Sequence, residues 1–196
     1  MPFGFVTMLF SNKNTGMARD DYERFVMPIQ GRMVDCVWRI VRDSHETEDV
    51  VQEALVHIMQ RFGEVRKHPN PTALLLRICA NKALDHLRRR DSRRDAMDRL
   101  ATLPHPAGST PSQELALADE RSLILDFVRT LPQREAEAIT LHALEELDYA
   151  AVAASMGCAE STVRVLIGRA RERFRKEFRS EQGPSPKSRI STPTGT

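Results

Sequence analysis

The most regular hydrophobic pattern in the chain lies in residues 131–178, where apolar side chains recur every three or four positions. This spacing predicts amphipathic helices, because residues three or four apart share one helix face. Gly157 interrupts the pattern, and glycine readily adopts the left-handed conformation in which a helix ends before the chain reverses. We therefore expect a tight turn at Gly157 and a further helix from about Glu160. The stripe before the turn consists of Tyr149, Val152, Ala153 and Met156, and the longer stripe after it of Val163, Ile167, Ala170, Phe174 and Phe178.

Two amphipathic helices joined by a short glycine-containing turn are typical of the helix-turn-helix motif, whose second helix enters a DNA major groove. Arginines flank the apolar stripe of the expected second helix on both sides, so this helix can bury one face and still offer guanidinium groups to phosphates or guanines. An ordinary three-helix bundle with a solvated basic face is the alternative. The agreement of turn, stripes and charge favours DNA binding. The flanking arginines are Arg164, Arg171 and Arg175 on one side and Arg169 and Arg173 on the other.

A second helical pattern covers residues 20–94 and is broken at Asp43-Ser44 and around Pro69–Pro71. Ser44 is expected to be the N-cap of the middle helix, and Pro71 suits the first position of the next one. The middle helix leaves its acidic residues facing outward, and the helix after Pro71 presents Asn81, Asp85 and Arg88 together on one face. The buried stripes are expected to be Val51, Leu55, Ile58 and Phe62 in the middle helix, and Leu75, Cys79, Ala83 and Leu87 in the next.

Periodicity is lost after residue 95, where prolines and glycine indicate a flexible linker, and again after Ser180. The fold class is therefore all-α, with two small helical domains that are either mobile or packed against each other in the free protein. The predicted divisions are a tail over 1–18, a first domain over 19–95, a linker over 96–112, a second domain over 113–179 and a disordered tail over 180–196.

Composition adds an uneven charge distribution to this picture. The chain of 196 residues has a formal net charge of only +2, but residues 43–60 carry five acids and no Lys or Arg, whereas residues 86–94 carry five arginines and one acid. Such segregation suggests two different partners. The odd number of cysteines, three, in apolar surroundings predicts small core residues of a reducing compartment, with no disulfide framework or zinc site. Without an expected membrane span, the chain is expected to be cytoplasmic.

Three segments in this order carry a resemblance to a known family: RDSHETEDVVQEALVHIMQRF, LLLRICANKALDHLRRR, and, after the linker, LPQREAEAITLHALEELDYAAVAASMGCAESTVRVLIGRARERF. Together they are similar to extracytoplasmic-function (ECF) sigma factors, the two-domain members of the sigma-70 family, over about residues 20–180. The resemblance implies an alternative sigma factor that binds core RNA polymerase and directs transcription from specific promoters. It implies no catalytic residue, no cofactor and no metal.

The resemblance also implies a role for each segment. The acidic helix would bind the clamp helices of the polymerase beta-prime subunit. The beta flap of the polymerase is a further expected partner. The helix after Pro71 would hold the melted minus-ten element, and residues 63–71 would form the loop that captures an extruded base. The helix after Gly157 would read the minus-thirty-five element. The residues that match are Asp49, Gln52 and Glu53 for polymerase, Asn81, Lys82, Asp85, Arg88 and Arg89 for the minus-ten element, and Thr162, Arg164, Val165, Gly168, Arg169 and Arg171 for the minus-thirty-five element.

The same resemblance implies an anti-sigma factor that holds the free protein inactive. The chain departs from the family pattern at Ala159, where Ser is usual, at Leu166, commonly Arg or Lys, and at Gly168, usually bulkier. Ala159 leaves the last helix without its best N-cap, a loss that typically costs about 1 kcal/mol. The departures concern which bases are read rather than the fold.

Two other functions compete with this interpretation. A regulator of the response-regulator or LuxR class shares the last domain, but it needs an upstream receiver or sensor domain with an alternating strand and helix pattern, which residues 20–94 lack. A nuclease would use Glu48, Asp49 and Glu53 with His45 or His57. These acids have neither metal-ligand spacing nor an accompanying glycine-rich phosphate loop, so an enzyme is not expected.

Overall fold

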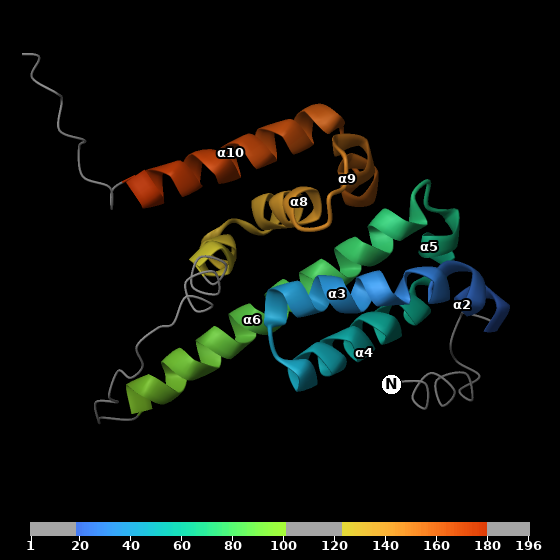
Figure 1. The fold of residues 1–196 in the computed structure, drawn as a ribbon, viewed down its shortest axis with the longest axis horizontal. Helices are drawn as coiled ribbons and strands as arrows, with labels where there is room; N and C mark the ends of the chain where they lie inside the picture. The colour runs from blue at the N-terminus through green and yellow to red at the C-terminus, as the bar shows by residue number, and fades with distance from the viewer. Residues whose placement is uncertain (1–18, 101–122, 180–196) are drawn as a thin grey trace, which may run out of the picture.

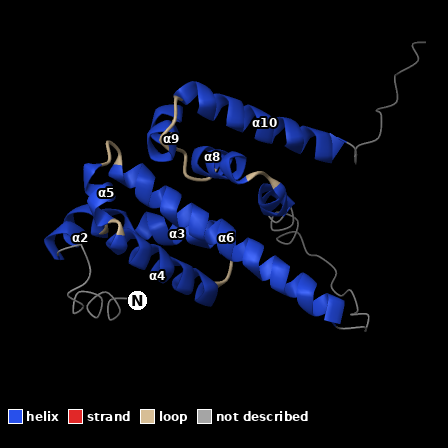
Figure 2. Cartoon of the chain, turned by 180° about the vertical axis from the view of Figure 1, so that it is seen from behind, coloured by secondary structure: helices blue, strands red, loops and turns tan. Residues whose placement is uncertain are grey.

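The computed structural model describes residues 19–100 and 123–179, and all regular structure in these two ranges is helical (Figures 1 and 2). The predictions for residues 1–18, for most of the linker and for the C-terminal tail lie outside them. The elements are α2 (Arg19–Phe25), the 3-10 turn η1 (Met27–Ile29), α3 (Gln30–Val41), α4 (Ser44–Gln60), α5 (Phe62–Lys67), α6 (Pro71–Leu100), a helical stretch over 123–130, α8 (Gln133–Ala143), α9 (Tyr149–Met156) and α10 (Glu160–Arg179).

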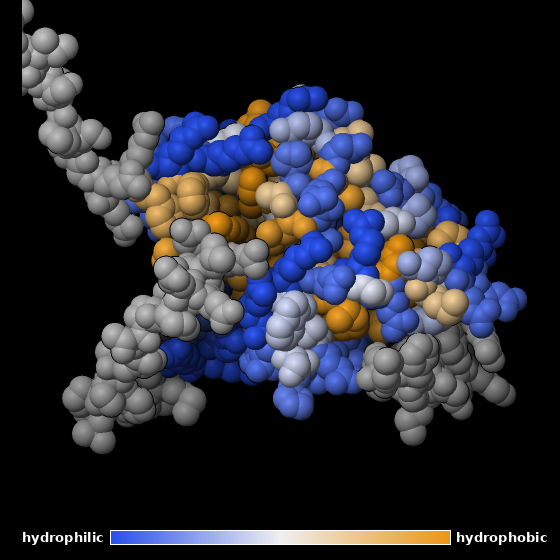
Figure 3. All heavy atoms as spheres, viewed as in Figure 1, coloured by the Kyte–Doolittle hydropathy of each residue, from blue (hydrophilic) through white to orange (hydrophobic). Residues whose placement is uncertain are grey.

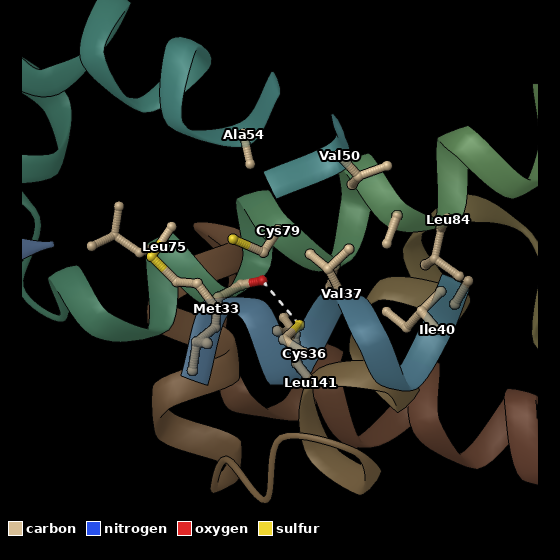
Figure 4. Packing of buried hydrophobic residues seen from close by; sticks show 14 of the residues in the cluster. Met33, Cys36, Val37, Ile40, Val50, Ala54, Leu75, Cys79, Leu84 and Leu141 are labelled. Atoms are coloured by element: carbon tan, nitrogen blue, oxygen red, sulfur yellow. Dashed lines mark hydrogen bonds between the residues drawn. The ribbon is translucent and has the colours of Figure 1, made fainter. Parts of the chain in front are cut away.

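The first domain, residues 19–100, packs α3 and α4 against α6 (Figure 1). The predicted stripes of α4 and α6 are buried, as the periodicity required. Figure 4 shows this core, in which Cys36 and Cys79 lie among aliphatic side chains and the Cys36 Sγ is 3.9 Å from the carbonyl oxygen of Leu76. Burial raises the pKa of Cys79 to about 12 and that of Cys36 well above its ordinary value. Both thiols are therefore protonated packing residues.

Polar side chains cap the N-terminal ends of α4 and α6. Asp43, not Ser44, is the N-cap of α4, because its Oδ1 accepts a hydrogen bond from the Glu46 backbone N–H at 2.9 Å; the prediction of Ser44 was wrong by one residue. This hydrogen bond also lowers the pKa of the Asp43 carboxyl. Asn70 acts similarly before α6, with its Oδ1 accepting from the Ala73 N–H at 3.0 Å.

Two predicted boundaries in the first domain differ from the structure. Most of the loop expected over residues 63–71 is helical, since α5 runs to Lys67, and only residues 68–70 connect it to α6. At its other end α6 continues to Leu100, past the expected start of the linker at residue 96. Residues 95–100 include the good helix formers Ala96, Met97, Arg99 and Leu100, and the first proline after them is Pro104, so this stretch contains no strong helix breaker.

The second domain, described over residues 123–179, contains the predicted helix-turn-helix. Gly157 ends α9 with φ 61°, in the left-handed region, and α10 begins at Glu160 as expected. Val163, Ile167 and Ala170 bury the apolar face of α10. Toward the end of α10, Phe174 and Phe178 contact Phe127 with ring centroids 5.2 and 6.3 Å apart. Figure 3 shows hydrophobic residues gathered beneath the hydrophilic outer side of α10.

The two domains pack against each other through α6. This helix contacts α3 and α4 on the first-domain side and α8 and α9 on the second-domain side, so the buried cluster runs through both domains (Figure 1). Packing is one of the two arrangements expected for the free protein. Among the described residues no single helix is both long and apolar enough to cross a membrane; only α9 and α10 taken as a pair reach that length and composition, and they meet at a bend of 102°.

Candidate nucleic-acid interface

The solvent side of α10 carries the residues predicted to read the minus-thirty-five element. Thr162 is half-buried, and the other five residues of that set are exposed. Gly168 lies in the helix with open space where a side chain would begin. Because the apolar face of α10 is buried in the same domain, the arginines on its outer side remain available to an external ligand.

One of these arginines is held by an aromatic ring. The Arg164 guanidinium carbon lies 4.5 Å from the centroid of the Tyr149 ring, and an Arg164 Nη lies 3.6 Å from the Glu160 carboxylate. The other neighbour of Tyr149 is His142, whose ring stacks on it at 4.7 Å. The sequence predicted Tyr149 only as part of a buried stripe, and the half-buried ring also supports a side chain of the predicted DNA-reading helix.

The residues predicted for the minus-ten element share one side of α6, which we call the α6 face: Asn81, Lys82, Asp85, Arg88 and Arg89. Lys82 Nζ and an Arg89 Nη lie 3.8 and 3.7 Å from the same carboxylate oxygen of Glu53 on α4. Arg88 pairs with Asp85 at 3.4 Å. The α6 face therefore combines an amide, which can hydrogen-bond base edges, with cations that can bind phosphates.

A hollow of about 350 Å³ opens beside this face. Asn81, Lys82 and Asp85 of α6 line it together with His57 of α4 and Arg61, which joins α4 to α5. Burial is the main cause that lowers the pKa of His57, and the neighbouring charges of Lys82 and Arg61 add to it. Gln133 of the second domain also lines the hollow.

The residues predicted to bind polymerase lie on the outer side of α4. Asp49 and Glu53 are exposed and Gln52 is half-buried, and together with Val56 and Gln60 they line a shallow depression. Within the described residues, no group of three or more His, Cys, Asp or Glu side chains is arranged to hold a metal ion.

The second domain contacts the first beside the α6 face. Arg77 of α6 donates from Nη1 to the Ser155 carbonyl oxygen at 2.7 Å, and its Nη2 lies 3.2 Å from Glu137 Oε2. The His68 Nε2 lies 3.0 Å from the Ala154 carbonyl oxygen, and Arg88 Nη2 lies 3.5 Å from that of Leu131. Sequence periodicity gave no signal for these contacts, because they depend on how the domains dock.

On the opposite side of the domain contact, the buried acid Glu145 pairs with Arg39 of the first domain. Glu145, in the turn between α8 and α9, is only 5% exposed, and its Oε1 lies 3.2 Å from Arg39 Nη1 of α3. Arg39 also donates to the Leu144 carbonyl oxygen. Burial raises the pKa of Glu145, and the charge of Arg39 and a contact with the Cys36 thiol oppose this shift without cancelling it.

Comparisons with known proteins agree with this architecture. Residues 25–93 match the family model "Sigma-70 region 2", and residues 121–174 match "Sigma-70, region 4". The chain is 31% identical over 163 residues to the RNA polymerase sigma-H factor of Pseudomonas aeruginosa, covering 79% of this chain and 84% of the relative. It is 29% identical over 164 residues to the ECF RNA polymerase sigma-E factor of Escherichia coli, covering 77% and 83%.

Solved structures show the same fold. The sigma factor RpoE of Bartonella quintana, in complex with the anti-sigma factor NepR, matches with a TM-score of 0.50 and 22% identity over 82% of this chain and 98% of that one. CnrH, in complex with the cytosolic domain of CnrY, matches with a TM-score of 0.51 and 19% identity over 84% and 91%. Both sigma-70 regions match in order, the sigma-H factor is 31% identical over most of its length, and the ECF sigma-E factor is 29% identical. This chain therefore belongs to the ECF sigma factors of the sigma-70 family and is an alternative sigma factor of RNA polymerase.

Proposed function

We propose that this sigma factor divides its work among three surfaces. Asp49, Gln52 and Glu53 bind the beta-prime clamp helices of core polymerase, and the second domain contacts the beta flap. The α6 face binds the separated strand of the minus-ten element, and the outer side of α10 binds the minus-thirty-five duplex. The observation that carries this proposal is the separation of charge, with exposed acids on α4 and exposed arginines on α10.

The chemistry of each surface supports its assigned partner. Exposed carboxylates facing basic clamp residues increase the association rate and specificity more than the affinity. The arginines and Asn81 of the α6 face offer donors to phosphates and base edges. Strand separation then needs no nucleotide hydrolysis, because a protein that binds the open strand more tightly than the duplex shifts the population toward open DNA.

The proposal also covers how the protein is regulated and where in the cell it works. The two solved relatives are complexes, one with the anti-sigma factor NepR and one with the cytosolic domain of CnrY. On this basis we propose that a cognate anti-sigma factor controls this chain in the cytoplasm. We propose further that the protein works as a non-enzymatic initiation factor without a cofactor or membrane insertion. A helix-turn-helix regulator that does not act as a sigma factor is not favoured, because region 2 of the sigma-70 family precedes the helix-turn-helix.

Run-off transcription tests the proposal. Core polymerase, with and without this protein, is incubated with a library of randomised promoters, and the transcripts are sequenced. We expect new transcripts only in the presence of the protein, from templates that share one sequence upstream of the start. If no template gains transcription, the assigned division of work is wrong.

A further inference from the structure

We infer that the apolar start of the chain, residues 1–10, packs on an exposed apolar stripe along η1 and α3. The stripe consists of Met27, Gly31, Val34 and Trp38, and we call it the α3 stripe. None of the three surfaces of the proposed function includes it. Residues 1–10 lie outside the described residues, so the inference concerns the place where they bind.

The α3 stripe is the most exposed apolar surface of the first domain. Gly31, Val34 and Trp38 follow one another at intervals of three and four residues on one face of α3, and Met27 precedes Gly31 by four. Among the described residues of this domain, three large hydrophobic side chains are exposed; two of them are Met27 at 55% and Trp38 at 41%. Figure 3 shows hydrophobic residues at the surface where α3 runs in Figure 1. Contiguous exposed apolar surface commonly marks a site that another segment covers.

The other sides of α3 already have partners. One side is buried against α4 and α6 in the core of the first domain. Another side faces the second domain, where Arg39 pairs with Glu145 and Arg32 reaches the Glu145 carbonyl oxygen at 3.5 Å. The α3 stripe lies on the remaining side, and Gly31 leaves open space in its middle. A segment that packs there displaces no contact that the described residues make.

Residues 1–10 have the composition that such a surface binds. Their sequence, MPFGFVTMLF, contains no charged residue, and the first charge in the chain is at Lys13. Water disfavours exposure of so many apolar side chains, and packing on the α3 stripe would remove both surfaces from water at once. The large apolar residues of the segment are Phe3, Phe5, Val6, Met8, Leu9 and Phe10.

The segment is also within reach. It joins the first domain at α2, whose seven residues span about 10 Å and which contacts η1, where the stripe begins. Residues 11–18 can extend over as much as about 26 Å, so residues 1–10 can lie along the stripe from its Met27 end. A tether this short gives an effective concentration on the order of millimolar. The chain's own segment is therefore favoured over a second copy at the micromolar concentrations of an ordinary solution.

Trp38 is the only tryptophan of the chain, so its fluorescence reports directly on whether the stripe is covered. The first experiment compares the full chain with Phe3→Glu/Phe5→Glu/Phe10→Glu. The matched control, Asn12→Glu/Asn14→Glu/Thr15→Glu, adds the same three charges to the polar stretch that follows. We expect the phenylalanine variant to shift Trp38 emission to the red and to increase its quenching by acrylamide. The control should match the wild type, and far-UV circular dichroism checks that all three proteins are folded.

The second experiment locates the contact. Phe5 is replaced by the photoreactive p-benzoylphenylalanine, and cross-linked peptides are identified by mass spectrometry. We expect cross-links within one chain to the peptide that contains Met27 or Trp38. Gly31→Glu, which puts a charge into the open space of the stripe, should abolish them. Gly63→Glu is the control, because Gly63 is also an exposed helical glycine with open space around it, on α5.

Three results would overturn the inference: equal Trp38 emission in the wild type and the phenylalanine variant, an equal response of the two triple variants, or cross-links that join separate chains or reach only other elements. Cross-links between chains would identify a second copy as the occupant instead. Neither readout involves polymerase or DNA, so the outcome is independent of the run-off test of the proposed function.

Discussion

The guanidinium of Arg164 lies over the ring of Tyr149, which supports it from the helix before the glycine turn. Arg164 is at the start of α10, where side chains of a recognition helix meet base edges. Because the ring restricts the directions that this long side chain samples, less conformational entropy would be lost in the proposed binding of Arg164 to DNA.

Replacing Tyr149 with Leu removes the ring and should weaken binding of the reconstituted holoenzyme to its promoter about two- to fivefold, as expected for a cation–π contact of about 0.5–1 kcal/mol. Tyr149→Phe keeps the ring and should bind like the wild type. Filter binding at several salt concentrations measures both. Equal weakening by Phe and Leu would show that the ring face is unimportant.

Removing the acids of α4 tests the polymerase surface. Asp49→Ala/Glu53→Ala should bind core polymerase about tenfold more weakly, mainly through a slower association rate, because exposed charges steer encounter more than they hold the complex. Surface plasmon resonance gives both rates. The control is Glu64→Ala, an exposed acid that pairs with Arg61 beside α4. An equal effect of Glu64→Ala would mean that general negative charge, not this surface, is recognised.

Two glycines of the second domain should respond to alanine with opposite signs. Gly157 has φ 61°, and a Cβ there would meet no other atom within 4 Å, so the whole cost of Gly157→Ala is backbone strain of about 1–2 kcal/mol. Gly168 lies inside α10 with the same open space, and Gly168→Ala should stabilise the helix by about 0.5–1 kcal/mol. Urea denaturation of both variants measures the difference. Destabilisation by Gly168→Ala would contradict this account.

The buried carboxyl of Glu145 predicts a pH dependence of folding. Burial raises its pKa above the ordinary 4.5, so the folded protein holds this proton more tightly than the unfolded chain does. The free energy of unfolding should therefore fall as the pH rises from about 4.5 through the raised pKa, and Glu145 contributes no further change above it. The groups that face it are Arg39, Arg32, Asp35 and Cys36 of α3, and Cys79 of α6.

Glu145→Gln removes the titrating group and should flatten this part of the profile. Asp43 contributes with the opposite sign, because its pKa is lowered and its stabilisation is lost as the pH falls. The difference between the wild type and Glu145→Gln isolates Glu145 from Asp43. Urea denaturation midpoints of both proteins, measured from pH 4 to pH 8 at intervals of about half a pH unit, provide the comparison. Parallel profiles would show that Glu145 is already solvated.

Hydrophobic periodicity predicted the helices because burial on one face is a local property of the sequence. The turn at Gly157 was predictable as well, because a left-handed helix end depends on the backbone of that single residue and is again a local property. Asp43 and Ser44 are both good N-cap residues, so residue type could not decide which of these two neighbours caps α4. Periodicity gave no sign that Glu137 and Glu145 are buried, because their partners Arg77 and Arg39 lie in the other domain. The exposure of the α4 acids and of the α10 arginines follows from the apolar stripes, whereas the contacts of Arg77 and His68 do not.

The protonated thiols of the first domain have a consequence for oxidative signals. Peroxides and alkylating reagents attack the thiolate, and a thiol with a pKa of about 12, such as Cys79, holds almost none at neutral pH. Cys36 is equally enclosed, whereas Cys158, beside the glycine turn, is partly accessible. Iodoacetamide applied to the native protein should therefore label Cys158 first, and the core should stay unmodified until it unfolds.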